Sequence, residues 1–341
     1  MSRTILFIGD STGGGVATIN NEVIKVAMEA GHRCLRLDTD RFKSRLPMIL
    51  AYPLAYLWTI VIILIHRPPV VYLQLAQTGY LHQSLFLLWA KLLRRETIAH
   101  FHAKADLQGS CTLRQFRQIL DSERYIDKMI LLTEPCRKSL SDNGWRGTTF
   151  VVPNFINAEG LSPTIPPVNA REDILFIGRM DHEKGIFDIL EVARRLPERT
   201  FVMVGNFADL TQEEEFRTRL ADLPNVDWVG PIYDDRKFAF YSRSKFLLFP
   251  TYRDEFPMTL IESTILGCIP LVSPVGSVGE IIRDGFNGVF IPPGDVEVMV
   301  AKIRELLGRD DLEEISANGV RFARANFTSD SVRDRLLKIM G

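Results

Sequence analysis

Short apolar segments alternate with helical segments along the whole chain. In the first half, runs of apolar and β-branched residues predict strands at 4–9, 33–37, 70–75, 97–101, 128–132 and 150–153. In the second half, they predict strands at 173–178, 200–205, 226–230, 245–250, 269–273 and 288–292. The gaps hold helical patterns, such as those over 16–31 and 187–196. This alternation is typical of parallel sheets with helices on both faces, so we expect an α/β fold.

The strand–helix pattern occurs twice, and the stretch that separates the two series, 157–173, is rich in Pro and Asn and has no apolar period. It reads as an interdomain linker. We therefore expect a domain over 1–156, a linker over 157–172, a domain over 173–325, and a final helix over 326–341 that packs back on the N-terminal domain. Two doubly wound domains are expected to face each other across a cleft, with ligands bound beyond the carboxyl ends of the strands.

One stretch is unusually apolar. Residues 46–65 contain no charged side chain and approach the ~20 residues that are needed to cross a bilayer. Basic residues precede this stretch and follow it, and a second apolar run over 84–93 ends in Arg94 and Arg95. Three interpretations stay open: a buried helix, a transmembrane span, or a surface helix that lies on an anionic membrane through 41–67 and 84–95.

Composition narrows the class of protein. The net charge of −1 over 341 residues provides no field that would attract nucleic acid. The four cysteines are scattered, which argues against a zinc site or a disulfide framework and favours a reducing compartment. The apolar run at the N-terminus is too short for a signal peptide, so we expect a cytoplasmic protein.

Two predicted strands of the first half are followed by unusual residues. Gly14 and Gly15 come after the first strand, where glycines let the backbone approach a ligand and a helix N-terminus binds an anion. The third glycine of a dinucleotide fingerprint is missing, but Asp38 and Asp40 leave a dehydrogenase as an open interpretation. A simple tight turn is another interpretation of the glycines.

His100 and His102 end the strand over 97–101, and we expect them on opposite sides of it, with one of them functional. The pair has no third ligand nearby, so we expect no metal.

Two strands of the second half are followed by charged residues. Arg179 and Lys184 share a loop that leads into a helix, which suits a diphosphate, although a solvated loop would also explain them. Asp254 precedes a helix that is predicted to start near Pro257, and Glu262 lies inside that helix. A buried glutamate must find hydrogen-bond donors, and ligand hydroxyls are plausible ones.

In this order and spacing, the segments resemble a known family. They are similar to segments of family 4 glycosyltransferases. The similar segments are ILFIGRMDHEKGIFDIL, FVMVG, VDWVGPI and LLFPTYRDEFPMTLIESTILGCIPLVSPVGSVGEIIRDGFNGVFIPPGD, and more loosely VVPNFIN. The resemblance covers nearly the whole chain and is strongest over 173–295. It implies the GT-B fold, with two Rossmann-like domains, and a retaining hexosyltransferase-type enzyme that needs no cofactor.

The resemblance implies roles for individual residues. Arg179 and Lys184 would bind the donor diphosphate, Glu262 the ribose hydroxyls, and Asp254, which stands where the family usually has Glu, the donor sugar. His102, with His100 as the fallback, would lie near the sugar. Gly14 and Gly15 would lie against the phosphates, and the loop 274–280 near the donor. Further substrate contacts are implied for Gly178, Asn154, Glu255, Phe256, Pro257 and Met258.

The implied substrates are a nucleoside diphosphate sugar, with UDP favoured over GDP, and a membrane-associated glycan or lipid-linked acceptor of surface polysaccharide or glycolipid biosynthesis. The enzyme would then work in the cytoplasm, at the inner face of the membrane. Two alternatives stay open. A sugar-nucleotide epimerase would turn over its donor without an acceptor, and a non-catalytic module would bind it without turnover.

Overall fold

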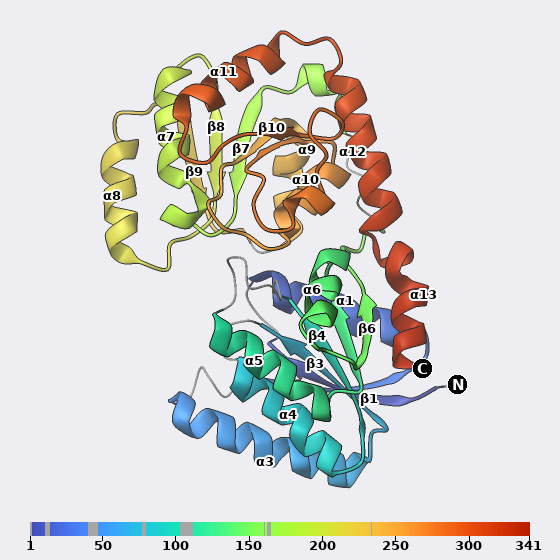
Figure 1. The fold of residues 1–341 in the computed structure, drawn as a ribbon. Coiled ribbons are helices and arrows are strands. Elements are labelled where there is room, and N and C mark those ends of the chain that lie inside the picture. Colours follow the sequence, from blue (N-terminus) through green and yellow to red (C-terminus); the bar gives the residue numbers. More distant parts are fainter. Residues whose placement is uncertain are drawn as a thin grey trace. The chain divides into compact units, whose positions relative to one another are not determined.

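The computed structural model describes residues 2–10, 14–39, 47–76, 80–102, 112–159, 161, 165–232 and 234–341. The chain divides into two compact units, which Figure 1 labels by their elements. Unit 1 comprises 1–157 together with 329–341, and unit 2 comprises 158–328.

Unit 1 is built on six parallel strands in the order β2-β1-β3-β4-β5-β6. The strands are β1 (Thr4–Gly9), β2 (Arg33–Asp38), β3 (Val70–Leu75), β4 (Glu96–Phe101), β5 (Lys128–Leu131) and β6 (Thr148–Val151). The helices are α1 (Gly14–Glu29), α3 (Met48–His66), α4 (Tyr80–Leu92), α5 (Leu113–Asp121), α6 (Glu134–Asp142) and α13 (Ser329–Met340). Every residue of β3 is buried, as expected for a strand inside a parallel sheet that is covered on both faces. The strand order reverses between β1 and β3, which makes their carboxyl ends the expected place for a ligand.

Unit 2 has six parallel strands in the order β12-β11-β10-β7-β8-β9. They are β7 (Asp173–Ile177), β8 (Phe201–Val204), β9 (Val226–Gly230), β10 (Ser244–Phe249), β11 (Ile269–Val272) and β12 (Val289–Phe290). Its helices are α7 (Ile186–Arg195), α8 (Leu210–Leu220), α9 (Lys237–Arg243), α10 (Met258–Ile265), α11 (Val296–Leu307) and α12 (Leu312–Asn326), with the short η3 (His182–Lys184) before α7. The order reverses between β7 and β10. The two parallel, helix-covered sheets confirm the predicted α/β class.

Two segments at the unit boundaries are fixed by side chains. The α13 helix belongs to unit 1, where Lys128 Nζ donates to the carbonyl of Ile339 at 2.6 Å and Arg333 pairs with Glu29 at 2.7 Å. The segment before β7 belongs to unit 2, because the buried Arg171 donates to the carbonyl of Pro166 at 2.8 Å and to that of Gly267 at 2.9 Å.

The α3 helix covers most of the apolar stretch 46–65. Ala51, Ala55, Thr59 and Ile63 recur every four residues and are buried against unit 1. The opposite side leaves six large apolar side chains exposed to solvent: Leu50, Leu54, Leu57, Trp58, Leu64 and Ile65. Among the described helices, α3 included, none combines the length and the apolar character that a membrane crossing requires.

Candidate functional site

The loop after β7 carries two of the predicted cations. Asp181 organises this loop, because its carboxylate accepts from the backbone N–H of Lys184 at 3.0 Å and pairs with the guanidinium of Arg179. The Arg179 side chain also lies 3.5 Å from the carboxylate of Glu183 and is 55% exposed. The loop follows Gly178, directly beyond the last residue of β7. Arg179 and Lys184 are therefore held in one turn at the carboxyl end of the sheet.

Lys184 meets the predicted acid Asp254, which follows the neighbouring strand β10. The ammonium of Lys184 donates to Asp254 Oδ2 at 2.6 Å and to the carbonyl of Arg253 at 3.1 Å. The two side chains are only 14% and 20% exposed, so water screens this pair less than a surface pair. The fold thus joins a cation and an acid that are 70 residues apart in the sequence.

The segment after Asp254 leads into α10 without a side-chain cap. Pro257 is the N-cap of α10, with extended backbone angles, and Met258 is the first helical residue. The N-cap residue Pro257 makes no side-chain bond to the helix, and a helix N-terminus of this kind favours an anion. Phe256 is buried against the ring of Phe327 at 5.9 Å between ring centroids and fixes the approach to the helix.

The loop 274–280 packs directly on this segment. The N–H of Ser277 donates to the carbonyl of Glu255 at 2.9 Å. Gly276 has a φ of +55°, and a Cβ at this position would lie 1.9 Å from the carbonyl oxygen of Asp254. Only glycine fits there, so the loop position depends on that residue.

Glu262 is almost fully buried in α10, and both of its oxygens have partners from α9. Lys237 Nζ lies 2.5 Å from Oε1, and the hydroxyl of Tyr241 donates to Oε2 at 2.9 Å. Burial, and after it the nearby Glu262 carboxylate, raises the pKa of Tyr241 well above its usual range, so its hydroxyl keeps its proton. Sequence reasoning missed Lys237 and Tyr241. Their spacing of four residues, which places both on one face of a helix, was the available signal.

His102 of unit 1 is held by two amides at the carboxyl end of β4. Its Nδ1 lies 3.2 Å from the side-chain oxygen of Asn154, and its Nε2 contacts that of Gln74. The expectation that His100 and His102 point to opposite sides is wrong, because residues two apart along a strand share a face. Their ring centroids are 4.1 Å apart.

Both histidines are neutral near pH 7. Burial lowers the pKa of His102 from its ordinary 6.5 to about 4. Burial, followed by the neighbouring His102 ring, holds the pKa of His100 well below its usual range. His100 Nδ1 lies 2.8 Å from the hydroxyl of the buried Tyr72. A neutral His102 carries a single N–H, so it can donate to only one of the two amide oxygens of Asn154 and Gln74.

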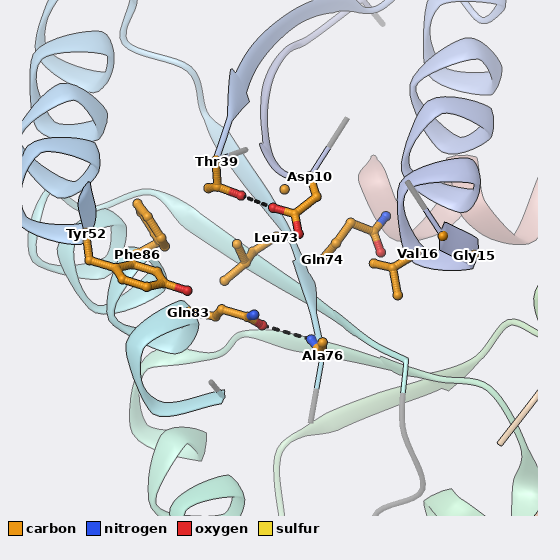
Figure 2. A pocket seen from close by; sticks show the side chains of 12 residues that line it. Asp10, Gly15, Val16, Thr39, Tyr52, Leu73, Gln74, Ala76, Gln83 and Phe86 are labelled. Carbon is orange, nitrogen blue, oxygen red and sulfur yellow. Dashed lines mark hydrogen bonds between the residues drawn. The ribbon is translucent and has the colours of Figure 1, made fainter. Parts of the chain in front are cut away.

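A cavity of about 250 Å³ lies at the carboxyl ends of β1 and β3. Figure 2 shows Tyr52 of α3 with its hydroxyl directed toward the space in front of Leu73, with Asp10, Gln74 and Gln83 around it. Gly14, which starts α1 with a φ of +75°, and Gly15 form part of its wall. The N–H of Ala76 donates to Gln83 at 2.8 Å, and Thr39 bonds to Asp10. Sequence reasoning predicted the two glycines and missed the other polar groups, because they come from five separate segments.

Within the described residues, no group of three or more His, Cys, Asp or Glu side chains could hold a metal ion. Asp38, one of the two acids that left a dehydrogenase open, pairs with Arg36, and Asp40 lies outside the described residues.

Comparison with known proteins identifies the fold and shows a family resemblance over part of the chain. The crystal structure of Anabaena HepE in complex with UDP-glucose has a TM-score of 0.79 at 15% identity, over 99% of both chains. The chain therefore has the architecture of GT-B glycosyltransferases. Residues 163–321 match the family of glycosyl transferases group 1. This segment, a little under half of the chain, resembles that family, as its motifs predicted.

Two curated relatives support this assignment. An uncharacterised glycosyltransferase of Methanocaldococcus jannaschii is 25% identical over 199 residues, which are 58% of this chain and 55% of that protein. The alpha-galactosylglucosyldiacylglycerol synthase of Streptococcus pneumoniae is 30% identical over 128 residues, which are 33% of this chain and 34% of that protein. The chain thus spans about half the length, or less, of these relatives.

Proposed function

We propose that this protein is a retaining glycosyltransferase that moves a hexosyl group from a nucleoside diphosphate sugar to a membrane-associated glycan or lipid-linked acceptor. The observation that carries the proposal is the set of cations beside an uncapped helix N-terminus in unit 2. Arg179 and Lys184 follow β7, and the N-terminus of α10, whose N-cap Pro257 makes no side-chain bond, follows β10. Such a set suits a diphosphate.

The donor diphosphate would take over the bonds that the cations now make to carboxylates. Lys184 is held by Asp254, and Arg179 by Asp181 and Glu183. In the reaction, the bond between the anomeric carbon and the β-phosphate oxygen breaks, and its electron pair stays on the phosphate. Arg179, Lys184 and the N–H groups of α10 would stabilise that charge. Released from Lys184, Asp254 could accept a hydrogen bond from the donor sugar, and Glu262 would accept those of the ribose.

Unit 1 would bind the acceptor. The new bond forms between an acceptor oxygen and the anomeric carbon on the face that the phosphate leaves, and the acceptor proton passes to a phosphate oxygen. We assign no covalent nucleophile. The cavity in Figure 2 suits an uncharged polyol or sugar ring, because its described lining combines one carboxylate, amides and hydroxyls with Tyr52 and Phe86, and includes no cation. Its volume of about 250 Å³ admits a single ring rather than a long chain.

A membrane surface is the proposed location of the acceptor. Tyr52 of the cavity stands on α3, the helix that exposes Leu54, Leu57 and Trp58. Arg67 follows this helix, and Arg94 and Arg95 follow α4, so an apolar face is flanked by cations that anionic lipids attract. The name of the pneumococcal relative specifies a diacylglycerol product, which agrees with a lipid-linked acceptor. We place the enzyme at the cytoplasmic face of the membrane, and UDP is the favoured nucleotide because HepE was solved with UDP-glucose.

The decisive experiment follows nucleotide release from a panel of UDP-, GDP- and ADP-sugars, with and without vesicles that carry lipid-linked sugars. We expect release from one donor only when an acceptor is present, together with an elongated glycolipid. Isomerisation of the donor without an acceptor would identify an epimerase. Donor binding without release in any mixture would identify a binding module. Either result would overturn the proposal.

A further inference from the structure

We propose that Lys237 is a positioning residue for the ribose-binding carboxylate of Glu262, so that recognition of the donor ribose depends on a lysine from a different helix. The inference rests on the proposed function, because it assumes that a nucleoside diphosphate occupies unit 2. It adds a residue that neither the family resemblance nor the sequence pattern assigns.

The geometry singles out Lys237. Its ammonium lies 2.5 Å from Oε1 of Glu262, whose side chain is 6% exposed, whereas the Lys237 side chain is 21% exposed. Lys237 is the first residue of α9, and its helical neighbour at i+4, Tyr241, bonds to the other oxygen of the same carboxylate. One face of α9 therefore supplies both the positive charge and the hydroxyl that hold Glu262.

The cost of burying an unpaired carboxylate explains why the contact between Lys237 and Glu262 matters. An ionised carboxylate that is buried without a positive partner is costly, and it either moves or takes up a proton. A carboxylate has about four lone-pair positions, so one bond to Lys237 and one to Tyr241 leave room for two ribose hydroxyls. Lys237 supplies the opposite charge and turns the carboxylate so that these remaining positions face the ligand. It does not itself have to contact the nucleotide.

A comparison of a ribonucleotide with its analogue that lacks the ribose hydroxyls distinguishes this role of Lys237 from a merely structural one. Calorimetry with UDP, GDP and ADP first finds the nucleotide that wild-type protein binds. The same nucleotide without its 2′ and 3′ hydroxyls is then compared with it. We expect Lys237→Met to weaken binding of the ribonucleotide at least tenfold and to change binding of the dideoxy form less than twofold. Lys237→Arg should recover most of the affinity, and Lys302→Met on the exposed side of α11 serves as the matched control.

Binding of the dideoxy form also shows that the variant is folded. If Lys237→Met does not fold, Glu262→Gln alone is compared with Glu262→Gln combined with Lys237→Met, because neither protein carries the unpaired carboxylate. Equal ribonucleotide affinities of these two proteins support the proposal, and a further loss in the double variant overturns it. Equal weakening of both nucleotides by Lys237→Met, or no weakening, also overturns it. Failure of the wild type to bind any nucleoside diphosphate would instead contradict the proposed function.

Discussion

The two units share a sheet design and differ in the chemistry at its carboxyl end. In unit 2, the loops after β7 and β10 and the helices α9 and α10 hold pairs of opposite charge, among them Arg179 with Asp181, Lys184 with Asp254, and Lys237 with Glu262. In the described part of unit 1, the corresponding end holds one carboxylate, amides, hydroxyls and aromatic rings around a small cavity, and two neutral histidines at the end of β4. Paired charges can exchange their partners for a charged ligand, whereas a hydrogen-bonding surface whose described lining includes no cation suits hydroxyl groups. This difference is the reason why we propose the diphosphate site in unit 2 and the acceptor site in unit 1.

Removing the cations of unit 2 should have the largest effect. We expect Arg179→Ala or Lys184→Ala to lower kcat/KM for sugar transfer by about 100- to 1,000-fold, because the charge that develops on the leaving diphosphate loses its partner. Nucleotide release measured at several donor concentrations tests this. Lys302→Ala, whose partner is Glu305 on the exposed side of α11, is the control. Kinetics near those of the wild type would remove the diphosphate from this loop.

We expect low pH to lower the stability of the protein through the neutral histidines of unit 1. Because the pKa of His102 is lowered to about 4 from 6.5, the unfolded chain binds a proton in this window that the folded chain does not. Stability therefore falls as the pH drops from about 6.5 to about 4, by at most about 3 kcal/mol for this residue.

Urea unfolding of the full chain between pH 4.5 and 7.5 measures this loss. His102→Gln, which cannot charge, should lose less stability than the wild type over that range. The control is His66→Gln at the exposed end of α3. Parallel pH profiles of the His102→Gln and wild-type proteins would mean that His102 is not buried in its neutral form.

Substitution of Gly276 tests whether the loop that supports Asp254 is rigid. Gly276→Ala puts a Cβ against the carbonyl of Asp254 at a φ of +55°, so it should cost about 1–3 kcal/mol of stability and raise the donor KM. Gly279→Ala in the same loop meets no atom within 4 Å and should behave as the wild type. Thermal melting and donor titration distinguish the two. Equal behaviour would show that this loop adapts and does not set the site.

The exposed face of α3 should give the smallest effect per residue. Leu57→Ser and Trp58→Ser remove side chains that are 58% and 53% exposed, so we expect unchanged melting and about fivefold weaker binding to anionic vesicles for each. Sedimentation with vesicles at low and high salt measures this. Leu210→Ser, at an 81% exposed position in unit 2, is the control. If the three variants bind alike, α3 does not provide the membrane contact.

Much of the fold could be predicted because a parallel strand is buried on both faces and reads as a continuous apolar run. The stretch VVYLQL predicted β3 with the bounds Val70–Leu75 that the structure has. The candidate residues in unit 2 were also predictable, because a Gly–Arg loop and a helix-start proline mark the carboxyl ends of β7 and β10. Their roles as donor contacts remain predictions.

The sequence by itself determined the two series of strands, the cations after β7 and the buried acid of α10, because each depends on residues close together along the chain. Only the tertiary structure decided that Lys184 meets Asp254, that α9 holds Glu262, that His100 packs on His102, and that Tyr52 of α3 joins Asp10 and Gln74 in one cavity. The physical reason is that these contacts join segments whose distance and direction are set by the order of strands in a sheet, and no local pattern of residues encodes that order.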